Sequence, residues 1–303
     1  MKILDFGSLN IDYTYEVDHI TQAGETQTAY SRTIFCGGKG LNQAIALAKA
    51  GSEVYLAGLI GDEGQMLVDA AAGAGVRTDL IRKIPGEATG HTIIQVDAEA
   101  NNCITLFPGT NRMIDHAFVD EVLAHFAAGD VILLQNEISS LDYIIDCAAR
   151  KGMMIILNPS PYDAHLRACD LTKVNLFLVN EVEGYQICGA HEPQKILDRM
   201  AAAYPDAKIV LTLGGDGSCC RDGVQCFRQE IFPVKAVDTT SAGDTFTGYF
   251  VTFLLEGRPI QECLRIAAMA SSISVSRPGA SASIPQRVQV LKALEDSAAQ
   301  MLL

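Results

Sequence analysis

Short apolar runs alternate with helical patterns along most of the 303-residue chain, and this alternation constrains the fold more than any other feature. Runs typical of buried strands occupy residues 2–7, 54–59, 131–135, 153–158, 176–180 and 208–213. Helical patterns lie between several of them, at 40–50, 65–74, 141–150 and 193–203. Strands that alternate with helices predict an α/β fold, in which a mainly parallel sheet is covered by helices on both faces.

Two stretches of the sequence do not follow this rhythm. Residues 13–35 are rich in Thr, Tyr, Val and Phe, which favour strands, around a predicted turn at 23–25. Residues 91–96 and 102–107 are predicted to form a hairpin. We interpret both stretches, over about 13–35 and 89–108, as one small β appendage inserted in two pieces. The chain shows no linker or repeat, so we expect a single domain over residues 1–303.

The charge balance restricts the partners of this chain. It carries 36 acidic and 23 basic residues, a formal net charge of −13. Because such a protein repels phosphate backbones and anionic lipid, we expect no nucleic-acid and no membrane partner. Nine scattered cysteines without a C-x-x-C pair disfavour a zinc site and are typical of reduced thiols. With no signal peptide and no long apolar run, the expected location is cytoplasmic.

The strongest motif is the run Asp-Thr-Thr-Ser-Ala-Gly-Asp-Thr-Phe-Thr-Gly at 238–248. It follows a strand-like segment at 232–237 and opens an apolar helical stretch that ends before Gly257. Ser241 is a good N-cap, so Ala242, Gly243 and Asp244 would form the first turn, with free N–H groups that favour an anion. Asp244 beside that anion suits a base in phosphoryl transfer, although acids are also common as plain helix caps.

Two long segments of the chain resemble the two signatures of the ribokinase-like carbohydrate kinases, the PfkB family. The first is Cys-Gly-Gly-Lys-Gly-Leu-Asn-Gln-Ala at 36–44, and the second is the run at 238–248. Further matching segments occur at 8–12, 135–137, 180–183, 212–215 and 277–279, so the resemblance covers essentially the whole chain. It implies a Rossmann-like three-layer α/β/α sandwich with a small β-sheet lid, and a homodimer formed through paired lids.

The resemblance also implies an activity, the transfer of the γ-phosphoryl group of ATP to a sugar hydroxyl. Asp244 would be the catalytic base, beside Ser241, Ala242 and Gly243. The matching positions imply sugar contacts at Asn10, Asp12, Gly37, Gly38, Lys39, Asn42, Thr92, Ile94, Leu106, Glu137 and Asp244. Carboxylates and amides suit polyols because each makes two hydrogen bonds. Without the family pattern, the same residues would be interpreted as strand-end turns, a helix start and apolar core.

Nucleotide and metal sites are implied in the same way. The positions that match nucleotide contacts are Asn180, Thr212, Gly214, Gly215, Gly217 and Gly243. Asn180 and Glu183 match a motif that organises Mg²⁺ through water, and an Asn and an acid at that spacing share one helix face. The positions around a monovalent cation, expected to be K⁺, are Asp238, Thr240, Ser274, Arg277, Gly279 and Ser283.

The substrate is less constrained than the reaction. Ribose, phosphorylated to ribose 5-phosphate, is the leading candidate, and relatives with the same core use fructose, 2-keto-3-deoxygluconate or nucleosides. A sensor that binds sugar or nucleotide without turnover is an alternative from another class. A dinucleotide-dependent oxidoreductase is excluded, because the first strand is followed by no G-x-G-x-x-G. Tyr249 departs from the family signature, which has a small residue there, and we expect it to alter packing.

Overall fold

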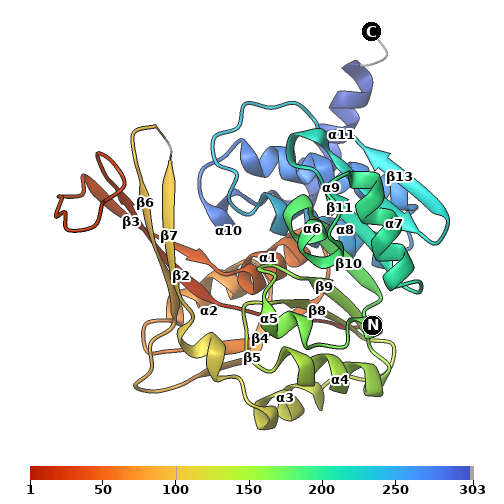
Figure 1. The fold of residues 1–303 in the computed structure, drawn as a ribbon, viewed down its shortest axis with the longest axis horizontal. Helices are drawn as coiled ribbons and strands as arrows, with labels where there is room; N and C mark the ends of the chain where they lie inside the picture. Colours follow the sequence, from red (N-terminus) through yellow and green to blue (C-terminus); the bar gives the residue numbers. More distant parts are fainter. Residues whose placement is uncertain (100, 301–303) are drawn as a thin grey trace.

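The computed structural model of the chain describes residues 1–99 and 101–300, and its larger sheet has nine strands (Figure 1). In spatial order they are β13 (Gln225–Gln229), β12 (Ser218–Asp222), β11 (Lys208–Thr212), β10 (Leu176–Asn180), β9 (Met154–Asn158), β8 (Val131–Gln135), β1 (Ile3–Phe6), β4 (Val54–Ile60) and β5 (Arg77–Lys83). The strands from β11 to β5 pair in parallel, and β12 and β13 add antiparallel at one edge. The predicted mainly parallel sheet is thereby confirmed.

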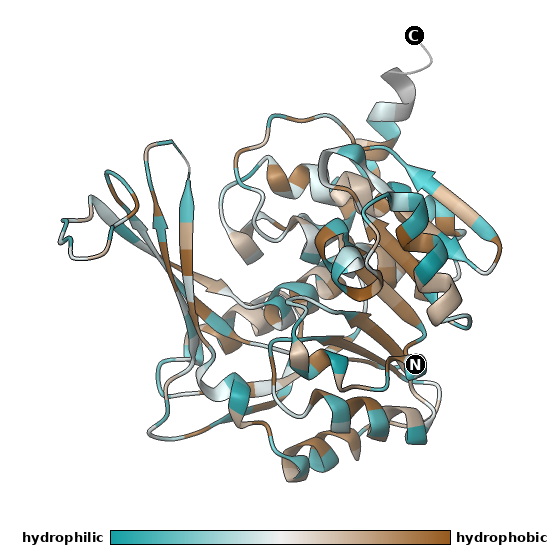
Figure 2. Cartoon of the chain, in the orientation of Figure 1, coloured by the Kyte–Doolittle hydropathy of each residue, from teal (hydrophilic) through white to brown (hydrophobic). Residues whose placement is uncertain are grey.

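Helices cover both faces of this sheet and enclose two apolar layers. One layer lies beneath α1 (Lys39–Ala50), α2 (Gln65–Gly73), α8 (Ala242–Leu255), α9 (Ile260–Val275) and α11 (Arg287–Gln300). The other lies beneath α3 (His116–Leu123), α4 (Leu141–Lys151), α5 (Ala164–Arg167), α6 (Glu181–Cys188) and α7 (Pro193–Ala203). Because strand side chains alternate, Ile3 joins the first layer and Leu4 the second. Figure 2 shows the apolar strands between these helices.

For this sheet, one predicted strand was wrong and three observed strands were not predicted. The segment 232–237, predicted as a strand, is an irregular loop. Pro233 has no N–H for a ladder, and Val234 and Val237 are exposed beside the candidate site. Strands β5, β12 and β13 were not predicted, because polar residues take up much of each strand and leave no apolar run typical of a buried strand.

The second sheet is the lid, with strand order β3 (Ser31–Gly37), β2 (Asn10–Glu16), β6 (Gly90–Val96) and β7 (Asn102–Phe107). It extends from one side of the sandwich, at the left of Figure 1. Strands β2 and β3 form an antiparallel pair, as do β6 and β7, and β2 pairs with β6 in parallel. The two β-rich stretches of the sequence thus join edge to edge in one sheet.

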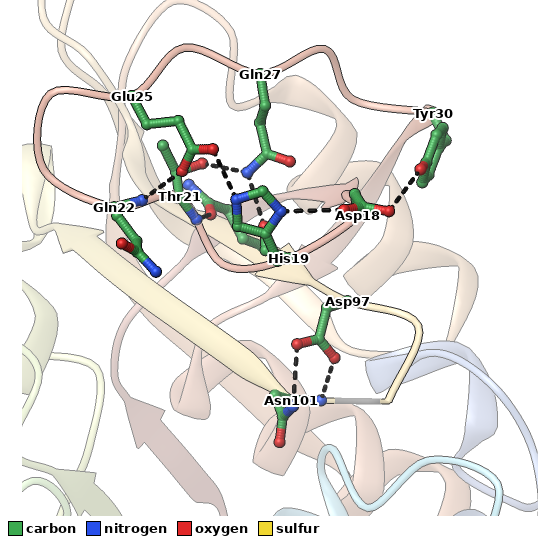
Figure 3. Close-up of polar contacts among 10 residues, drawn as sticks. Asp18, His19, Thr21, Gln22, Glu25, Gln27, Tyr30, Asp97 and Asn101 are labelled. Atoms are coloured by element: carbon green, nitrogen blue, oxygen red, sulfur yellow. Dashed lines mark hydrogen bonds and ion pairs between the residues drawn. The ribbon is translucent and has the colours of Figure 1, made fainter.

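A loop at the tip of the lid, between β2 and β3, is ordered by polar contacts (Figure 3). The His19 ring bonds Asp18 Oδ2 at 3.1 Å and Glu25 Oε1 at 2.7 Å. Gln27 Nε2 donates to the His19 carbonyl oxygen at 2.7 Å. The Asp18 and Glu25 carboxylates raise the pKa of His19 above its ordinary value, and the His19 contact helps to lower the pKa of each of these carboxyls.

Helices α1 and α8 pack closely at one point, where Gly248 meets Ala46. A Cβ atom at Gly248 would lie 2.4 Å from the Ala46 Cβ and 2.7 Å from the Leu47 backbone nitrogen. The next residue, Tyr249, is fully buried, and its hydroxyl donates to the Pro285 carbonyl oxygen at 2.7 Å. Among the described residues, no helix is both long and apolar enough to cross a membrane.

Candidate active site

The candidate site lies at the carboxyl ends of the parallel strands. Register pairs Gln135 with Asn158 at the ends of β8 and β9, and Asn180 with Thr212 at the ends of β10 and β11. Strands that run in the same direction bring their last residues to one edge of a sheet, where α/β proteins bind ligands. Polar side chains gather there because the sequence changes from apolar to amide and hydroxyl residues at each strand end.

Asp244 lies in the first turn of α8 and is only 8% exposed. Its Oδ2 accepts a hydrogen bond from Asn42 Nδ2 at 3.1 Å, and its Oδ1 accepts one from Gln43 Nε2 at 2.8 Å. Both donors are on α1, so the two signature segments meet at this carboxylate. A Cβ built on Gly243 would meet no atom within 4 Å, which leaves open space beside the helix N-terminus.

Ser241 occupies the N-cap position of α8, as predicted, but its side chain does not cap the helix. Its backbone is left-handed, with φ of 61°, and within the described part of the chain its Oγ is buried without a hydrogen-bond partner. The Ser241 hydroxyl makes no capping hydrogen bond to the first turn of α8. The N–H groups of that turn are therefore not blocked by a side-chain cap, and an anion could accept hydrogen bonds from them.

Asp12 is held on the inner side of the lid. Its Oδ1 accepts a hydrogen bond from Thr92 Oγ1 at 2.6 Å. Burial raises the pKa of Asp12 to about 6; the Thr92 hydrogen bond opposes this shift and the Glu137 charge adds to it. A Cβ at Gly37 would lie 1.9 Å from Asp12 Oδ2, so only glycine leaves room for this carboxylate.

Lys39 and Glu137 lie between the lid and α8. The Ser8 hydroxyl donates to Glu137 Oε2, and the Lys39 backbone N–H donates to the same oxygen at 3.2 Å. Burial opposes the charge of the Lys39 ammonium, but Asp244, Glu137 and Glu183 outweigh it and raise the pKa of Lys39 above its ordinary value. The cation therefore stays charged among three carboxylates.

Asn10 is oriented by a residue that the sequence analysis missed. Asn111 Nδ2 donates to Asn10 Oδ1 at 2.7 Å, while the backbone N–H of Leu9 donates to Asn111 Oδ1 at 3.1 Å. Asn111 lies in a short 3-10 helix after the lid, Gly109–Met113, which no pattern in the sequence predicted. Its Asn-Arg pair after Pro108-Gly109 is ordinary turn chemistry and gave no signal of a site.

A polar cavity of about 720 Å³ opens between the lid and α8. Of the residues predicted to contact sugar, all but Gly37 line it: Asn10, Asp12, Gly38, Lys39, Asn42, Thr92, Ile94, Leu106, Glu137 and Asp244. Gly37 lies behind Asp12 instead. Other lining residues, which were not predicted as sugar contacts, include Thr14, Phe35, Val96, Asn102 and Ile104. Carboxylates and amides on one wall and apolar lid residues on the other suit a small polyol.

An apolar cavity of about 370 Å³ lies on the other side of the α8 N-terminus. Predicted residues at its rim are Thr212, Gly214, Gly215, Gly217 and Gly243. Its walls were not predicted, and they include Ile231, Phe232, Val234, Ala268, Ser272 and Val275. Most of these groups are apolar and come from a loop and from α9, so their chemistry gave no sequence signal. An apolar space next to glycine-rich backbone fits a heterocycle attached to phosphates.

A narrower polar channel of about 250 Å³ extends past Asp244, and Lys39, Asn180 and Glu183 line it. Asn180 and Glu183 form a capping box at the start of α6: Glu183 N donates to Asn180 Oδ1 at 2.9 Å, and Asn180 N donates to Glu183 Oε2 at 3.0 Å. Within residues 1–99 and 101–300, no cluster of three or more His, Cys, Asp or Glu side chains forms a metal site.

The residues predicted around a monovalent cation are only partly brought together. Asp238 accepts hydrogen bonds from the backbone N–H of Thr240, at 2.9 Å, and of Gly279, at 3.0 Å. Ser274 and Ser283 bond each other at 2.7 Å, buried beneath this loop. Arg277 lines none of the three cavities just described.

In this α/β sandwich with a lid sheet, a polar and an apolar cavity meet at one helix N-terminus, an arrangement typical of a class of proteins with two adjacent sites for small ligands. The sequence model of the pfkB family carbohydrate kinases matches residues 2–287 of the chain. The chain belongs to this family.

Two curated relatives and one solved structure show how similar the chain is to known members. It is 34% identical to a ribokinase of Haemophilus influenzae, over 95% of this chain and 97% of the relative. It is 28% identical to a deoxyribokinase of Salmonella typhi, over 94% and 96%. The structure of Arabidopsis thaliana ribokinase complexed with ribose and ATP has a TM-score of 0.84 and 30% identity, over 96% of this chain and 97% of that one.

Proposed function

We propose that this chain is an ATP-dependent sugar kinase that transfers the γ-phosphoryl group of ATP to a sugar hydroxyl, with D-ribose as the substrate and ribose 5-phosphate as the product. One observation carries the proposal: the Asp244 carboxylate lies where the polar cavity, the polar channel and the N-terminus of α8 meet. The ribose and ATP bound by the Arabidopsis relative are ligands of the kinds that the two cavities suit.

In this mechanism the polar cavity holds the sugar and Asp244 receives the proton of the attacking hydroxyl. Asn10 and Asp12 bind sugar hydroxyls, and Asn42 adds a donor next to the base. The two hydrogen bonds on Asp244 keep its carboxylate fixed, so that little reorganisation is needed when the hydroxyl approaches. General-base assistance of this kind contributes about 100- to 10,000-fold to the rate.

The helix N-terminus and Lys39 stabilise the transferring phosphoryl group. The first turn of α8 lines the channel, and the absence of a side chain at Gly243 leaves room for phosphate oxygens. The Ala242 N–H already donates to the Thr239 carbonyl oxygen at 3.3 Å, so the Gly243 N–H, which no side chain caps, is the donor proposed for the phosphoryl group. The Lys39 ammonium supplies a positive charge between the base and Glu183. The adenine of ATP fits the apolar cavity lined by Phe232 and Ala268.

Two metal ions are part of the proposal. The oxygens of Asn180 and Glu183 line the polar channel but are already engaged in the capping box, so they fit Mg²⁺ held through water. Mg²⁺, when bound, neutralises charge that develops on the phosphates. The Asp238 carboxylate, with Thr240 and Gly279 beside it, fits K⁺ next to the α8 start. A rate that does not respond to added K⁺ would contradict the second site.

We further propose a homodimer formed through the outer face of the lid. Alternate residues of the lid strands point away from the polar cavity, and three large apolar ones are exposed: Ile34 by 38%, Ile93 by 45% and Phe107 by 49%. An apolar sheet face of this kind needs a partner to leave water. Light scattering should give twice the chain mass, and Ile93→Asp should give a monomer. A monomeric wild-type protein would contradict the proposal.

The proposed substrate is tested by ADP release with Mg-ATP and K⁺ and a panel of ribose, deoxyribose, fructose, 2-keto-3-deoxygluconate and adenosine. Efficient turnover of ribose alone supports the proposal in full. Turnover of another member keeps the mechanism and replaces the substrate, with deoxyribose the nearest alternative because of the Salmonella relative. If no compound turns over, binding of the same panel tests whether the chain is a sensor.

A further inference from the structure

The middle of β1 carries a buried acid for which the proposed mechanism gives no reason. Asp5 is 0% exposed and lies in register with Leu56 on β4 and Leu133 on β8. Its side chain is on the same face of the sheet as Ile3, beneath α1 and α8. A carboxyl group in an apolar layer costs free energy unless it is compensated, so its presence needs a specific partner.

That partner is a chain of two amides that leads to the active site. Gln135 Nε2 donates to Asp5 Oδ1 at 3.1 Å and to Gln43 Oε1 at 2.9 Å. Gln43 Nε2 in turn donates to Asp244 Oδ1 at 2.8 Å. The hydrogen bonds therefore connect Asp5, Gln135, Gln43 and Asp244 without a break, from the centre of the sheet to the carboxylate at the start of α8.

The order of donors and acceptors along this series of hydrogen bonds fixes which end of each amide faces Asp244. An amide has a donor end and an acceptor end, so the Gln135 NH₂ group, held by Asp5, presents a donor to the Gln43 oxygen. Gln43 then has only its NH₂ group to offer to Asp244. The backbone makes room for this arrangement, because a Cβ at Gly7 would lie 2.2 Å from Gln135 Oε1 and 2.9 Å from Asp5 Oδ1.

We propose that Asp5 is a positioning residue for phosphoryl transfer, which acts through Gln135 and Gln43 to orient the amide that donates to the Asp244 carboxylate. This inference rests on the proposed role of Asp244 as the base. With Oδ1 held by Gln43, the Oδ2 atom, which Asn42 also contacts, remains available to receive the proton of the sugar hydroxyl. Removing the acceptor at Asp5 lets both amides rotate, and Asp244 then loses one of its two donors, Gln43, while Asn42 remains.

The charges around Asp5 indicate which substitutions separate this role from ordinary packing. Burial raises the pKa of Asp5 well above its usual value; the Gln135 hydrogen bond opposes the shift, and the Asp244 charge adds to it. Lys39 is the charged group that faces Asp244 from α1. A neutral carboxyl offers Gln135 a carbonyl oxygen, and Asn offers the same. Asp5→Asn therefore keeps the acceptor, whereas Asp5→Leu removes it and keeps an apolar filling of similar size.

The experiment compares the pH dependence of kcat in these two variants, with the sugar that the panel identifies. We expect Asp5→Leu to lower kcat about tenfold and to move the acidic limb of the profile to higher pH by about one unit, since a hydrogen bond that stabilises the ionised base is lost. The sugar KM should stay the same. Asp5→Asn should keep both the rate and the profile. Leu133→Ala, beside Asp5 in the same layer, should lower the melting temperature and leave the acidic limb in place.

A double-mutant cycle provides the second measurement. If Asp5 acts through the amide chain, Asp5→Leu should add little to the loss already caused by Gln43→Leu. If Asp5→Leu does not fold, Gln135→Leu interrupts the chain at its middle and should give the same shifted profile. A folded Asp5→Leu or Gln135→Leu with wild-type kcat and profile, or losses that add in full, would overturn the proposal.

Asp244→Asn, measured in parallel, separates this failure from a failure of the base assignment. Wild-type turnover by that variant would remove the base role itself, and the inference about Asp5 with it. An inactive Asp244→Asn together with an unaffected Asp5→Leu would overturn only the inference about Asp5.

Discussion

The two cavities that meet near Asp244 are lined by residues of different chemical character. The cavity under the lid has one wall of carboxylates, amides and a lysine, among them Asp12 and Asn42, and one wall of apolar lid residues. The cavity on the far side of α8 is lined by glycine backbone and by apolar side chains such as Phe232 and Ala268. A ligand in the first must therefore match directional bonds, whereas a ligand in the second must mainly match a shape.

The largest effect is expected where the two cavities meet. Asp244→Asn keeps the side-chain volume but removes the proton acceptor, so kcat should fall about 100- to 10,000-fold. The protein should still bind both ligands, because neither cavity loses its shape. Steady-state kinetics measures the loss, and calorimetry with sugar or with ATP is the control. Turnover near the wild-type rate would show that the base lies elsewhere.

Of the two cavities, only the polar one should bind its ligand in a pH-dependent way between pH 5 and pH 8. The pKa of Asp12 is raised to about 6, so its carboxylate is ionised above this pH and becomes protonated below it. We expect the sugar KM to rise by up to about tenfold for each pH unit below 6, while the ATP KM changes much less. Kinetics from pH 5 to pH 8 measures this. Asp12→Asn is the control, and the inference fails if its sugar KM shows the same acid dependence.

A larger side chain in either cavity should weaken binding of that cavity's ligand alone. Ala268→Leu fills part of the apolar cavity and should raise the ATP KM by about tenfold or more, with the sugar KM unchanged. Ile94→Phe is the matched variant under the lid and should raise the sugar KM only. Initial rates with each substrate varied in turn give both constants. If either variant moved both constants equally, the two cavities would not be independent.

The smallest effect is expected at the tip of the lid, outside both cavities. The raised pKa of His19 means that its contribution to loop order is complete below its unfolded pKa and is lost as pH rises through the folded value. The lowered pKa values of Asp18 and Glu25 mean that their part is lost only in strong acid. His19→Ala should change kcat by less than about twofold, because the contacts are exposed.

The checking measurement is hydrogen exchange of the amides of the loop between β2 and β3. In the wild-type protein, exchange corrected for its intrinsic pH dependence should be faster at pH 9 than at pH 6, and His19→Ala should remove the difference. A variant that kept the wild-type pH response would show that the His19 contacts do not order the loop.

The contrast between the cavities also explains what could be predicted from the sequence. Strands such as β8 and β10 were predicted because they are continuous apolar runs, whereas Asp12 and Asn42 were predicted because they match positions of the PfkB family pattern. Ile231 and Ala268 were not predicted, since an apolar wall has the same composition as a core. The roles of Asn111 and Asp5 were also missed, because each depends on a residue far away in the chain.

The contact between Gly248 and Ala46 has a consequence for how this molecule can change. It lies four residues beyond Asp244 on α8 and four residues beyond Asn42 on α1, one helical turn from the hydrogen bond that joins them. The contact therefore sets the distance between Asp244 and its two donors on α1. A single methyl group added at Gly248 would push α1 and α8 apart. A larger residue on one helix would therefore need a compensating smaller residue on the other. We expect a substitution on one helix alone to lower the reaction rate before it lowers the melting temperature.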